Sequence, residues 1–371
     1  MLISLSTTIF CILHHPQLAL STKTNVMVED SLLPLLYNRT QDSVVLITTK
    51  VNPVYLHRGP LATGTSASSE SIDVPVARGS GFVYDKEGHI ITNYHVLQGG
   101  TSVDVRFMDG NSYSARLIGK DPYSDLAVLQ LDPLAIYNQR LIPLSLGNSS
   151  LLKVGQHAVA IGNPLGFSGT MTEGIISQLN AIIPVGGIYH ARMIQIDVPT
   201  THGNSGGPLL NLDGQVIGIT ELGLPQVGFL NFAIPADKVA KVVPQLISNG
   251  TYKNVWLGIS GTDVTPDIAK AVGLNQAKGV IVIYVTPDSP AYTAGVRSGN
   301  NENRLMLYGS DSNINSDADI VVGIDDKQVR QQGDLLNYID GKSPGDQVTL
   351  KVVRNKLILD LRAVLTERPS G

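Results

Sequence analysis

Between Gly79 and Pro235 the sequence consists of short apolar or alternating runs that Gly, Asn and Asp residues interrupt. Helical periodicity is weak here, and runs of this length separated by turn residues are typical of strands. Clear examples are Gly88–Thr92, Ser102–Phe107, Leu126–Leu131, Ala158–Gly162 and Gln215–Thr220. The pattern predicts an all-β barrel or sandwich domain.

The pattern changes near Gly250, which predicts a second domain. Apolar residues from Val239 to Ile247 share one helical face, and the helix should end at Gly250, with Pro244 kinking it or ending it early. After this helix, strand and helix patterns are mixed. We expect strands at Val280–Val285, Ile320–Ile324, Gln347–Val353 and Leu357–Leu365, and helices at Ser289–Ala294 and Gly333–Ile339.

The composition excludes several classes of protein. A formal net charge of −4 gives no basic field for nucleic acid, and 43% hydrophobic residues are enough to build cores. The single cysteine, Cys11, excludes an intramolecular disulfide framework and a zinc site built on cysteine pairs. The 371 residues agree with two domains, which we assign to 22–250 and 251–371.

The first 21 residues are mostly apolar, uncharged up to Leu13, and followed by small residues. We expect residues 1–21 to be a signal peptide or a membrane anchor, with a buried strand as the alternative. The Gly- and Ser-rich segment Val51–Val76 is predicted to be a long surface loop.

The turn His202-Gly-Asn-Ser-Gly-Gly-Pro-Leu209 is a candidate site for a nucleophile, because glycines lie on both sides of Ser205. Glycine adopts turns that a Cβ forbids, and such a turn can direct the N–H groups of Gly203 and Ser205 to one point. Convergent N–H groups are what an oxyanion hole requires, so Gly203, Asn204 and Ser205 are the candidates. A glycine-rich turn with a serine is common, however, and needs matching residues elsewhere.

A serine hydroxyl becomes a nucleophile when a base takes its proton and an acid orients that base. His95 ends the strand-like run that begins at Ile90, a position where an imidazole can be held rigidly over a cleft. Asp125 stands at the entry to the apolar strand Leu126–Leu131, where it can be partly buried and still reach a ring N–H. For a lone histidine, an ordinary core or surface role is the alternative.

Six ordered motifs resemble those of the HtrA (DegP/DegS-like) serine proteases, and the similarity extends from about Val28 to Arg368. The motifs are Gly79–Val83, Ile91–Val96, Ser124–Leu129, Gly162–Gly166, Gly174–Ser177 and Gly203–Leu209. The resemblance implies a chymotrypsin-like double β-barrel followed by one small α+β PDZ domain. It also implies His95 as general base, Asp125 as the residue that orients it, Ser205 as nucleophile, and no cofactor.

The resemblance also assigns the loops. Val51–Val76 corresponds to a regulatory loop, Pro184–Ala191 to a sensor loop that reports PDZ occupancy, and Pro199–His202 and Leu222–Gly228 to the walls of the specificity pocket. The pocket candidates are Thr201, His202, Leu222, Leu224 and Phe229. These mostly apolar side chains favour cleavage after small or medium aliphatic residues; alternatively, they only fill the barrel core.

Three charged or titratable side chains lie near this pocket in the sequence or in its adjoining loop. Glu221 is the only acid close by, and the sequence does not put it at the pocket floor. His202 replaces the Pro or Arg usual in the family, and it is either inert or makes activity depend on pH near neutrality. His190 and His202 lack metal-ligand spacing, so we expect no metal site.

In the C-terminal segment, Val255–Ile259 resembles a PDZ carboxylate-binding loop, in which a peptide adds as a strand beside a helix. The candidate peptide-binding residues are Trp256, Leu257, Gly258, Ile259, Leu336 and Ile339, the last two being alternatively core residues. The residues 300–317, rich in Asn, Asp and Ser, read as a polar inserted loop.

Together these features predict an extracytoplasmic serine endopeptidase that cleaves unfolded or damaged proteins and is regulated by its PDZ domain. The expected partners are unfolded polypeptides, C-terminal peptides and, by resemblance, further copies of the chain in a homotrimer or a higher multiple, with Tyr37 as a contact. Nucleic acid is not an expected partner. The alternative function is a catalytically idle peptide-binding or chaperone protein with the same fold.

Overall fold

The structure is a computed structural model that describes residues 32–51, 74–163, 169–185, 188–200, 203–221, 230–299, 304–305 and 314–369. The predicted leader 1–21 and residues 52–73 of the predicted long loop lie outside these ranges. Within the described part of the chain, no helix has both the length and the apolar character needed to cross a membrane.

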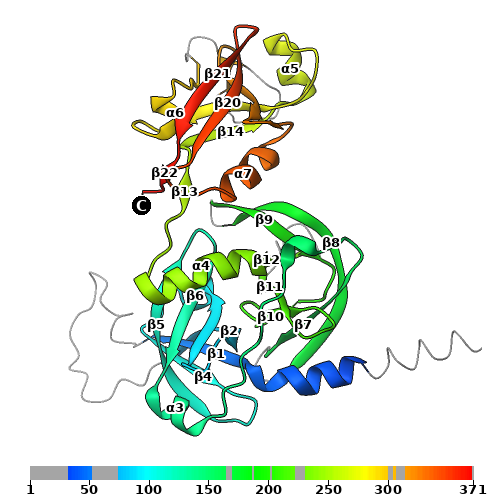
Figure 1. The fold of residues 1–371 in the computed structure, drawn as a ribbon, viewed down its shortest axis with the longest axis vertical. Helices are drawn as coiled ribbons and strands as arrows, with labels where there is room; N and C mark the ends of the chain where they lie inside the picture. Colours follow the sequence, from blue (N-terminus) through cyan, green and yellow to red (C-terminus); the bar gives the residue numbers. More distant parts are fainter. Residues whose placement is uncertain are drawn as a thin grey trace, which may run out of the picture.

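Two closed six-stranded antiparallel barrels form the first part of the molecule (Figure 1). The first has the order β1-β2-β3-β6-β5-β4 and the second the order β10-β11-β12-β9-β8-β7, so neither leaves an unpaired edge. The first barrel contains β1 (Val44–Val51), β2 (Val74–Val83), β3 (His89–Asn93), β4 (Ser102–Arg106), β5 (Ser112–Asp121) and β6 (Leu126–Leu131). The second contains β7 (His157–Gly162), β8 (Thr170–Val185), β9 (Ile188–Ile196), β10 (Pro208–Leu210), β11 (Val216–Glu221) and β12 (Asn231–Pro235).

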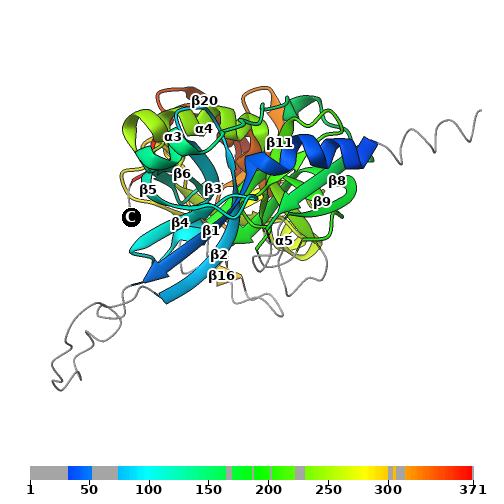
Figure 2. The ribbon, with the colours of Figure 1, turned by 90° about the horizontal axis from the view of Figure 1, so that it is seen from below.

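An apolar seam joins the two barrels. Each barrel has a core of its own, and a third cluster combines Phe82 and Ile91 of the first barrel with Ile161 and Ile219 of the second. The helix at residues 32–40 packs on the same cluster and crosses from the second barrel into β1 of the first (Figure 2). Burial of these side chains therefore holds the barrels side by side.

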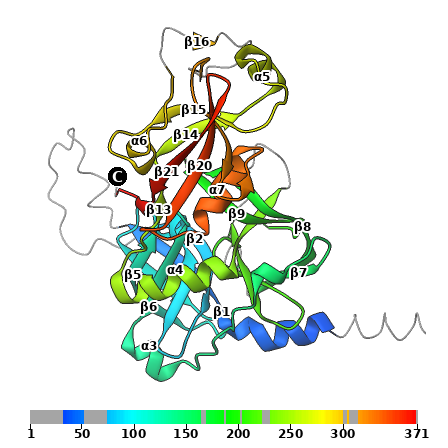
Figure 3. The ribbon, with the colours of Figure 1, turned by 45° about the horizontal axis from the view of Figure 1, so that its top comes forward.

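Helix α4 (Ala236–Asn249) follows the second barrel and lies across both (Figure 3). Its apolar face, which includes Val239, Val242, Val243 and Leu246, is buried in the seam. The helix ends at Gly250, which has φ 76°, as the sequence predicts. It continues past Pro244, so the expectation of an early end was wrong: the buried face on both sides of the proline stabilises the helix.

The C-terminal domain is a six-stranded antiparallel sheet with short helices. The sheet contains β14 (Ile259–Asp263), β15 (Val280–Val285), β18 (Ile320–Ile324), β19 (Lys327–Gln328), β20 (Gln347–Arg354) and β21 (Leu357–Val364), and a separate pair is formed by β13 (Val255–Trp256) and β22 (Thr366–Glu367). The helices are α5 (Pro266–Val272), α6 (Pro290–Thr293) and α7 (Gln332–Asp340). The remaining short elements of the chain are α3 (Pro133–Asn138) and the 3₁₀ turns η1 (Gln41–Ser43), η2 (Tyr94–Leu97) and η3 (Ser149–Leu151).

The predicted fold class, a mainly β double barrel followed by a small α+β domain, is confirmed. The polar insertion at 300–317 was expected to be a surface loop, but its described residues also form a strand pair and contribute a buried side chain. Its described residues include a strand pair, β16 (Arg304–Leu305) and β17 (Ile314–Asn315), and Ile314 is buried in an apolar cluster. One apolar residue thus anchors the end of this segment to the domain.

Helix α7 connects the C-terminal domain to the β8–β9 hairpin of the second barrel (Figure 1). The Asn337 side chain donates to the Asn180 carbonyl oxygen at 3.1 Å and accepts from the Arg192 N–H at 2.8 Å. Asp340 forms an ion pair with Lys238 of α4 at 2.8 Å. The two strands of the hairpin and α4 therefore all contact the same helix.

The close packing of α4 on β5 generates a prediction. A Cβ at Gly119 would lie 2.3 Å from the Leu246 carbonyl oxygen and 2.7 Å from its carbonyl carbon, both of which are backbone atoms. We expect Gly119→Ala to lower the free energy of unfolding by about 1–3 kcal/mol, because the helix must shift away from the barrel. Chemical denaturation measures this, with Gly341→Ala as control, since a Cβ there makes only ordinary contacts. Equal stability of the two variants would contradict this packing.

Candidate active site

Asp125 is held by three consecutive residues at the end of β3. Its carbonyl oxygen accepts hydrogen bonds from the Asn93 side chain and the Tyr94 N–H, each at 3.0 Å. Its carboxylate accepts the His95 N–H at 2.8 Å and lies 2.6 Å from His95 Nδ1. The carboxylate therefore fixes both the backbone and the ring of His95, as expected of an acid that orients a general base.

The turn before β6 gives Asp125 its position. Asp125 adopts φ 52°, in the left-handed region, and is buried. Asp121 stabilises the turn by accepting hydrogen bonds from the Tyr123 N–H at 3.1 Å and from the Ser124 hydroxyl. His95 itself lies in the 3₁₀ turn η2. Strand β3 ends at Asn93, so His95 follows the strand after one further residue and does not end it.

The turn that carries Ser205 is packed against the end of β3. A Cβ at Gly206 would lie 2.3 Å from the Thr92 hydroxyl and 3.0 Å from the Asn93 nitrogen. A Cβ at Gly79 would lie 2.6 Å from a Val96 methyl and 3.0 Å from the Ser205 carbonyl oxygen. The glycines thus bring the serine from the second barrel close to the residues on either side of His95 in the first.

Ser80 of β2 makes several hydrogen bonds to this turn, a role that its motif in the sequence did not indicate. Its buried hydroxyl donates to the Gly203 carbonyl oxygen at 2.6 Å and accepts the Asn163 N–H at 2.9 Å. Its N–H donates to the Ser205 carbonyl oxygen at 2.8 Å. Ser80 thus holds both ends of the segment from Gly203 to Ser205. The sequence signal was a polar residue between two glycines within an apolar strand.

Thr220 of β11 holds the same turn from the opposite side. Its hydroxyl donates to the Asn204 carbonyl oxygen at 2.6 Å, and its carbonyl oxygen accepts the Gly206 N–H at 2.9 Å. Gly203 adopts φ 109°, which explains the need for glycine there. Among the hydrogen bonds of the described residues, none uses the N–H groups of Gly203 or Ser205 as donors. The same two N–H groups are the candidates that the sequence offers for binding an oxyanion.

The electrostatics of His95 involve two carboxylates. Burial of the ring lowers its pKa, but the hydrogen bond to Asp125, the charge of Asp125 and the charge of Glu221 together raise the pKa above the ordinary histidine value. A general base must be neutral, so activity that depends on His95 should fall as the pH drops through this raised pKa. No bond between His95 and Ser205 occurs among the described hydrogen bonds, as is common before substrate binds.

The predicted specificity pocket lies outside the described residues: Thr201, His202, Leu222, Leu224 and Phe229 all fall there. The pocket assignment and the role of His202 therefore stay predictions. Glu221, immediately before this segment, is described, and it is buried at 2% exposure. Among the described residues, no group of three potential metal-ligating side chains exists.

The predicted peptide-binding loop of the C-terminal domain has an unusual backbone at Gly258. Gly258 adopts φ 86°, and a Cβ there would lie 2.1 Å from Ser289 Cβ. The Leu257 carbonyl oxygen accepts the Ala291 N–H and the Gly258 carbonyl oxygen accepts the Thr286 N–H, both at 2.9 Å. Since these two carbonyl oxygens are already bonded, the N–H groups of the loop are the candidates for binding a carboxylate. Ile259 begins β14, and Trp256 pairs with β22.

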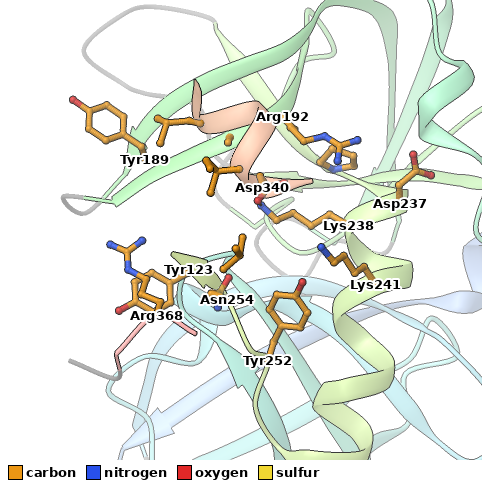
Figure 4. A pocket seen from close by; sticks show the side chains of 15 residues that line it. Tyr123, Tyr189, Arg192, Asp237, Lys238, Lys241, Tyr252, Asn254, Asp340 and Arg368 are labelled. Carbon is orange, nitrogen blue, oxygen red and sulfur yellow. The ribbon is translucent and has the colours of Figure 1, made fainter. Parts of the chain in front are cut away.

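Leu336 and Ile339 of α7 line a cavity of about 130 Å³ between the C-terminal domain and the barrels. Ile339 is also part of the C-terminal core together with Leu257. Figure 4 shows the charged wall of this cavity, with Lys238 beside Asp340, and Arg368 beside Tyr123. Both predicted residues therefore contact the domain interface, and Ile339 additionally has the core role that was the alternative.

Comparison with known proteins identifies both parts of the chain. Residues 79–219 match the trypsin-like peptidase domain, and residues 255–365 match the PDZ domain. A probable periplasmic serine endoprotease, DegP-like, from Hahella chejuensis is 37% identical over 79% of this chain and 57% of its own length. Its counterpart from Brucella suis is 34% identical over 80% of this chain and 54% of its own length. The chain thus spans little more than half the length of these curated relatives.

Solved structures of serine proteases are also similar to this chain in fold. The HtrA-type protease AlgW with decapeptide has a TM-score of 0.68 and 28% identity, and the match covers 91% of this chain and 98% of that one. The serine endoprotease from Yersinia pestis has a TM-score of 0.59 and 25% identity over 91% of this chain and 98% of that one. The likeness includes both barrels and the C-terminal domain.

The contacts of Ser80 generate a prediction. In Ser80→Ala the Gly203 carbonyl oxygen loses its donor, and the backbone of the candidate oxyanion hole can turn away. We expect the rate of Ser205 labelling by a fluorophosphonate to fall by about ten-fold or more, because the probe's phosphoryl oxygen needs the same N–H groups. The matched control is Ser43→Ala, since the Ser43 hydroxyl is equally buried but has no hydrogen-bond partner in the described part of the chain. An unchanged labelling rate in Ser80→Ala, with the same melting temperature, would exclude the positioning role.

Proposed function

We propose that this chain, which resembles the HtrA-type (DegP-like) serine proteases in both of its domains, is a serine endopeptidase that cleaves unfolded or damaged polypeptides. The observation that carries the proposal is the double contact of the Asp125 carboxylate with His95, at 2.8 Å to the N–H and 2.6 Å to the ring. An Asp that holds the ring in this way leaves Nε2 as the acceptor for a serine proton.

In the proposed mechanism, Ser205 attacks the scissile carbonyl carbon while His95 accepts the hydroxyl proton. The N–H groups of Gly203 and Ser205 stabilise the oxyanion of the tetrahedral intermediate, and the Asn204 peptide between them is held by Thr220. His95 then returns the proton to the leaving amine, and an acyl-enzyme remains. Water attacks the acyl-enzyme by the same route, so the reaction needs no cofactor.

The finer properties are proposed as well. We infer that cleavage follows small or medium aliphatic residues, from the apolar side chains of the predicted pocket wall. The PDZ domain is proposed to bind C-terminal peptides through Trp256–Ile259 and thereby regulate the protease, a role supported by the loop backbone, in which Gly258 adopts φ 86° and the Leu257 and Gly258 carbonyl oxygens already accept hydrogen bonds. The relatives named as periplasmic support an extracytoplasmic location, with residues 1–21 as leader or anchor.

The alternative is a catalytically idle peptide-binding or chaperone protein with the same fold. A resting enzyme and an idle one share the His95–Asp125 pair, so the two differ only in whether Ser205 reacts.

A fluorophosphonate probe and denatured casein separate these two functions. We expect the full chain to be labelled and to cleave casein, and Ser205→Ala to lose both by about 10⁴-fold or more, because no other hydroxyl replaces the nucleophile. Ser43→Ala, another buried serine, should retain both. If casein stays intact at several pH values and with C-terminal peptides added, while the chain still prevents its aggregation, the chaperone function replaces the protease.

A homotrimer of the protease domains is the proposed assembly, by family resemblance. Tyr37, the aromatic residue predicted for this contact, is half-buried and donates to the Gly169 carbonyl oxygen of its own chain at 2.8 Å. It can thus brace the helix at residues 32–40 for contact with a neighbour. We expect sedimentation equilibrium of the full chain to give three times the mass of one chain; a monomer at micromolar concentration would contradict the trimer.

A further inference from the structure

Glu221 and His190 form a buried pair of titratable side chains beside the active site. Glu221 ends β11 and is 2% exposed, and His190 of β9 is 4% exposed. The distance from His190 Nδ1 to Glu221 Oε1 is 3.7 Å, close enough for charge attraction but too long for a hydrogen bond. Within the described part of the chain, neither Glu221 oxygen nor His190 Nδ1 has a hydrogen-bond partner.

Such an arrangement is costly for folding alone. A buried carboxylate without hydrogen bonds loses its hydration and gains little in return, and an apolar side chain of similar size would be more stable there. The position of Glu221 in the chain offers a reason. It follows Thr220, which holds both neighbours of Ser205, and its charge acts on the ring of His95. The carboxylate therefore stands on the strand of the second barrel that holds the Ser205 turn, near enough for its charge to raise the pKa of His95.

We propose that Glu221 is a second acidic residue of the active site, which assists Asp125 in stabilising the protonated ring of His95, and that His190 holds the Glu221 carboxylate from the β8–β9 hairpin. Asp125 orients the ring from the first barrel by direct contact, whereas Glu221 acts on it from the second barrel through charge. Glu221 therefore touches no reacting atom in this proposal. Its charge acts on the reaction through the ring of His95.

Among the described residues, the charges that raise the pKa of His95 are those of Asp125 and Glu221, and the titratable side chain within ion-pair distance of Glu221 is His190. Removal of the Glu221 charge leaves the Asp125 contacts in place and should make His95 easier to deprotonate. An enzyme that needs neutral His95 would then keep more of its activity under acidic conditions.

The test is an NMR titration of the His95 ring in the full chain, with ¹⁵N-labelled histidine and the Ser205→Ala background. His95 is assigned by the loss of its signal in His95→Gln. We expect the titration midpoint of His95 to move to lower pH in both Glu221→Gln and Glu221→Thr, because both side chains lack the charge. Glu173→Gln on β8 is the matched control: it removes an exposed carboxylate that contacts His157, and it should leave the His95 midpoint unchanged.

The activity readout is the fluorophosphonate labelling rate of the same variants with Ser205 intact. The ratio of the rate at about pH 5.5 to that at about pH 8 should rise by about three-fold or more in Glu221→Gln. A merely structural role would lower both rates together and leave their ratio constant.

For His190, the measurement is a double-mutant cycle. If His190 orients the carboxylate, the change in the His95 midpoint caused by Glu221→Gln must be smaller in a His190→Gln background. Equal changes in both backgrounds would overturn the role of His190.

A His95 midpoint that stays constant, or moves upward, in both Glu221 variants would overturn the proposal. The role of Glu221 rests on the proposed function of His95 as general base. The experiments must therefore distinguish a failure of the Glu221 proposal from a failure of the protease proposal. The NMR titration needs no proteolysis. A chain that never reacts with the probe would refute the protease, while the titration would still decide whether Glu221 acts on His95.

Discussion

The candidate active site depends on the fixed relation of two barrels, because no single barrel contains all of it. His95 and Asp125 belong to the first barrel and Ser205 to the second. The apolar seam supplies the binding energy between them, and Ser80 supplies the alignment, since its hydroxyl and N–H reach across the seam to Gly203 and Ser205. Non-directional burial alone would let the barrels slide, whereas hydrogen bonds with buried partners accept only one geometry.

The second barrel is in turn held by elements that follow it in the chain. Helix α4 lies across both barrels, and α7 of the C-terminal domain contacts α4 and both strands of the β8–β9 hairpin. Arg192, whose N–H binds Asn337, is two residues from His190 on the same strand. A chain of direct contacts therefore connects the PDZ domain with the hairpin that packs beside Glu221.

The two carboxylates that act on His95 differ in how many hydrogen-bond donors they have. Asp125 is well supplied with donors, and its contacts fix one orientation of the ring. Glu221 has no such donors among the described residues, and its burial has a folding cost that the imidazole of His190 can reduce. A carboxylate kept under these conditions acts on its neighbours more strongly than an exposed one, because little water screens it.

The sequence by itself determined the strand-rich first domain and the helix that ends at Gly250, and its motifs singled out His95, Asp125 and Ser205 as candidates, because strand length, turn glycines and local motifs are written in consecutive residues. It did not determine the helix through Pro244, the burial of Ile314 or the hydrogen bonds of Ser80, since these depend on partners far away in the chain. The same holds for Glu221: only the closure of the second barrel brings His190, distant in sequence, against it. Packing between segments decides such contacts, and a local pattern carries no record of them.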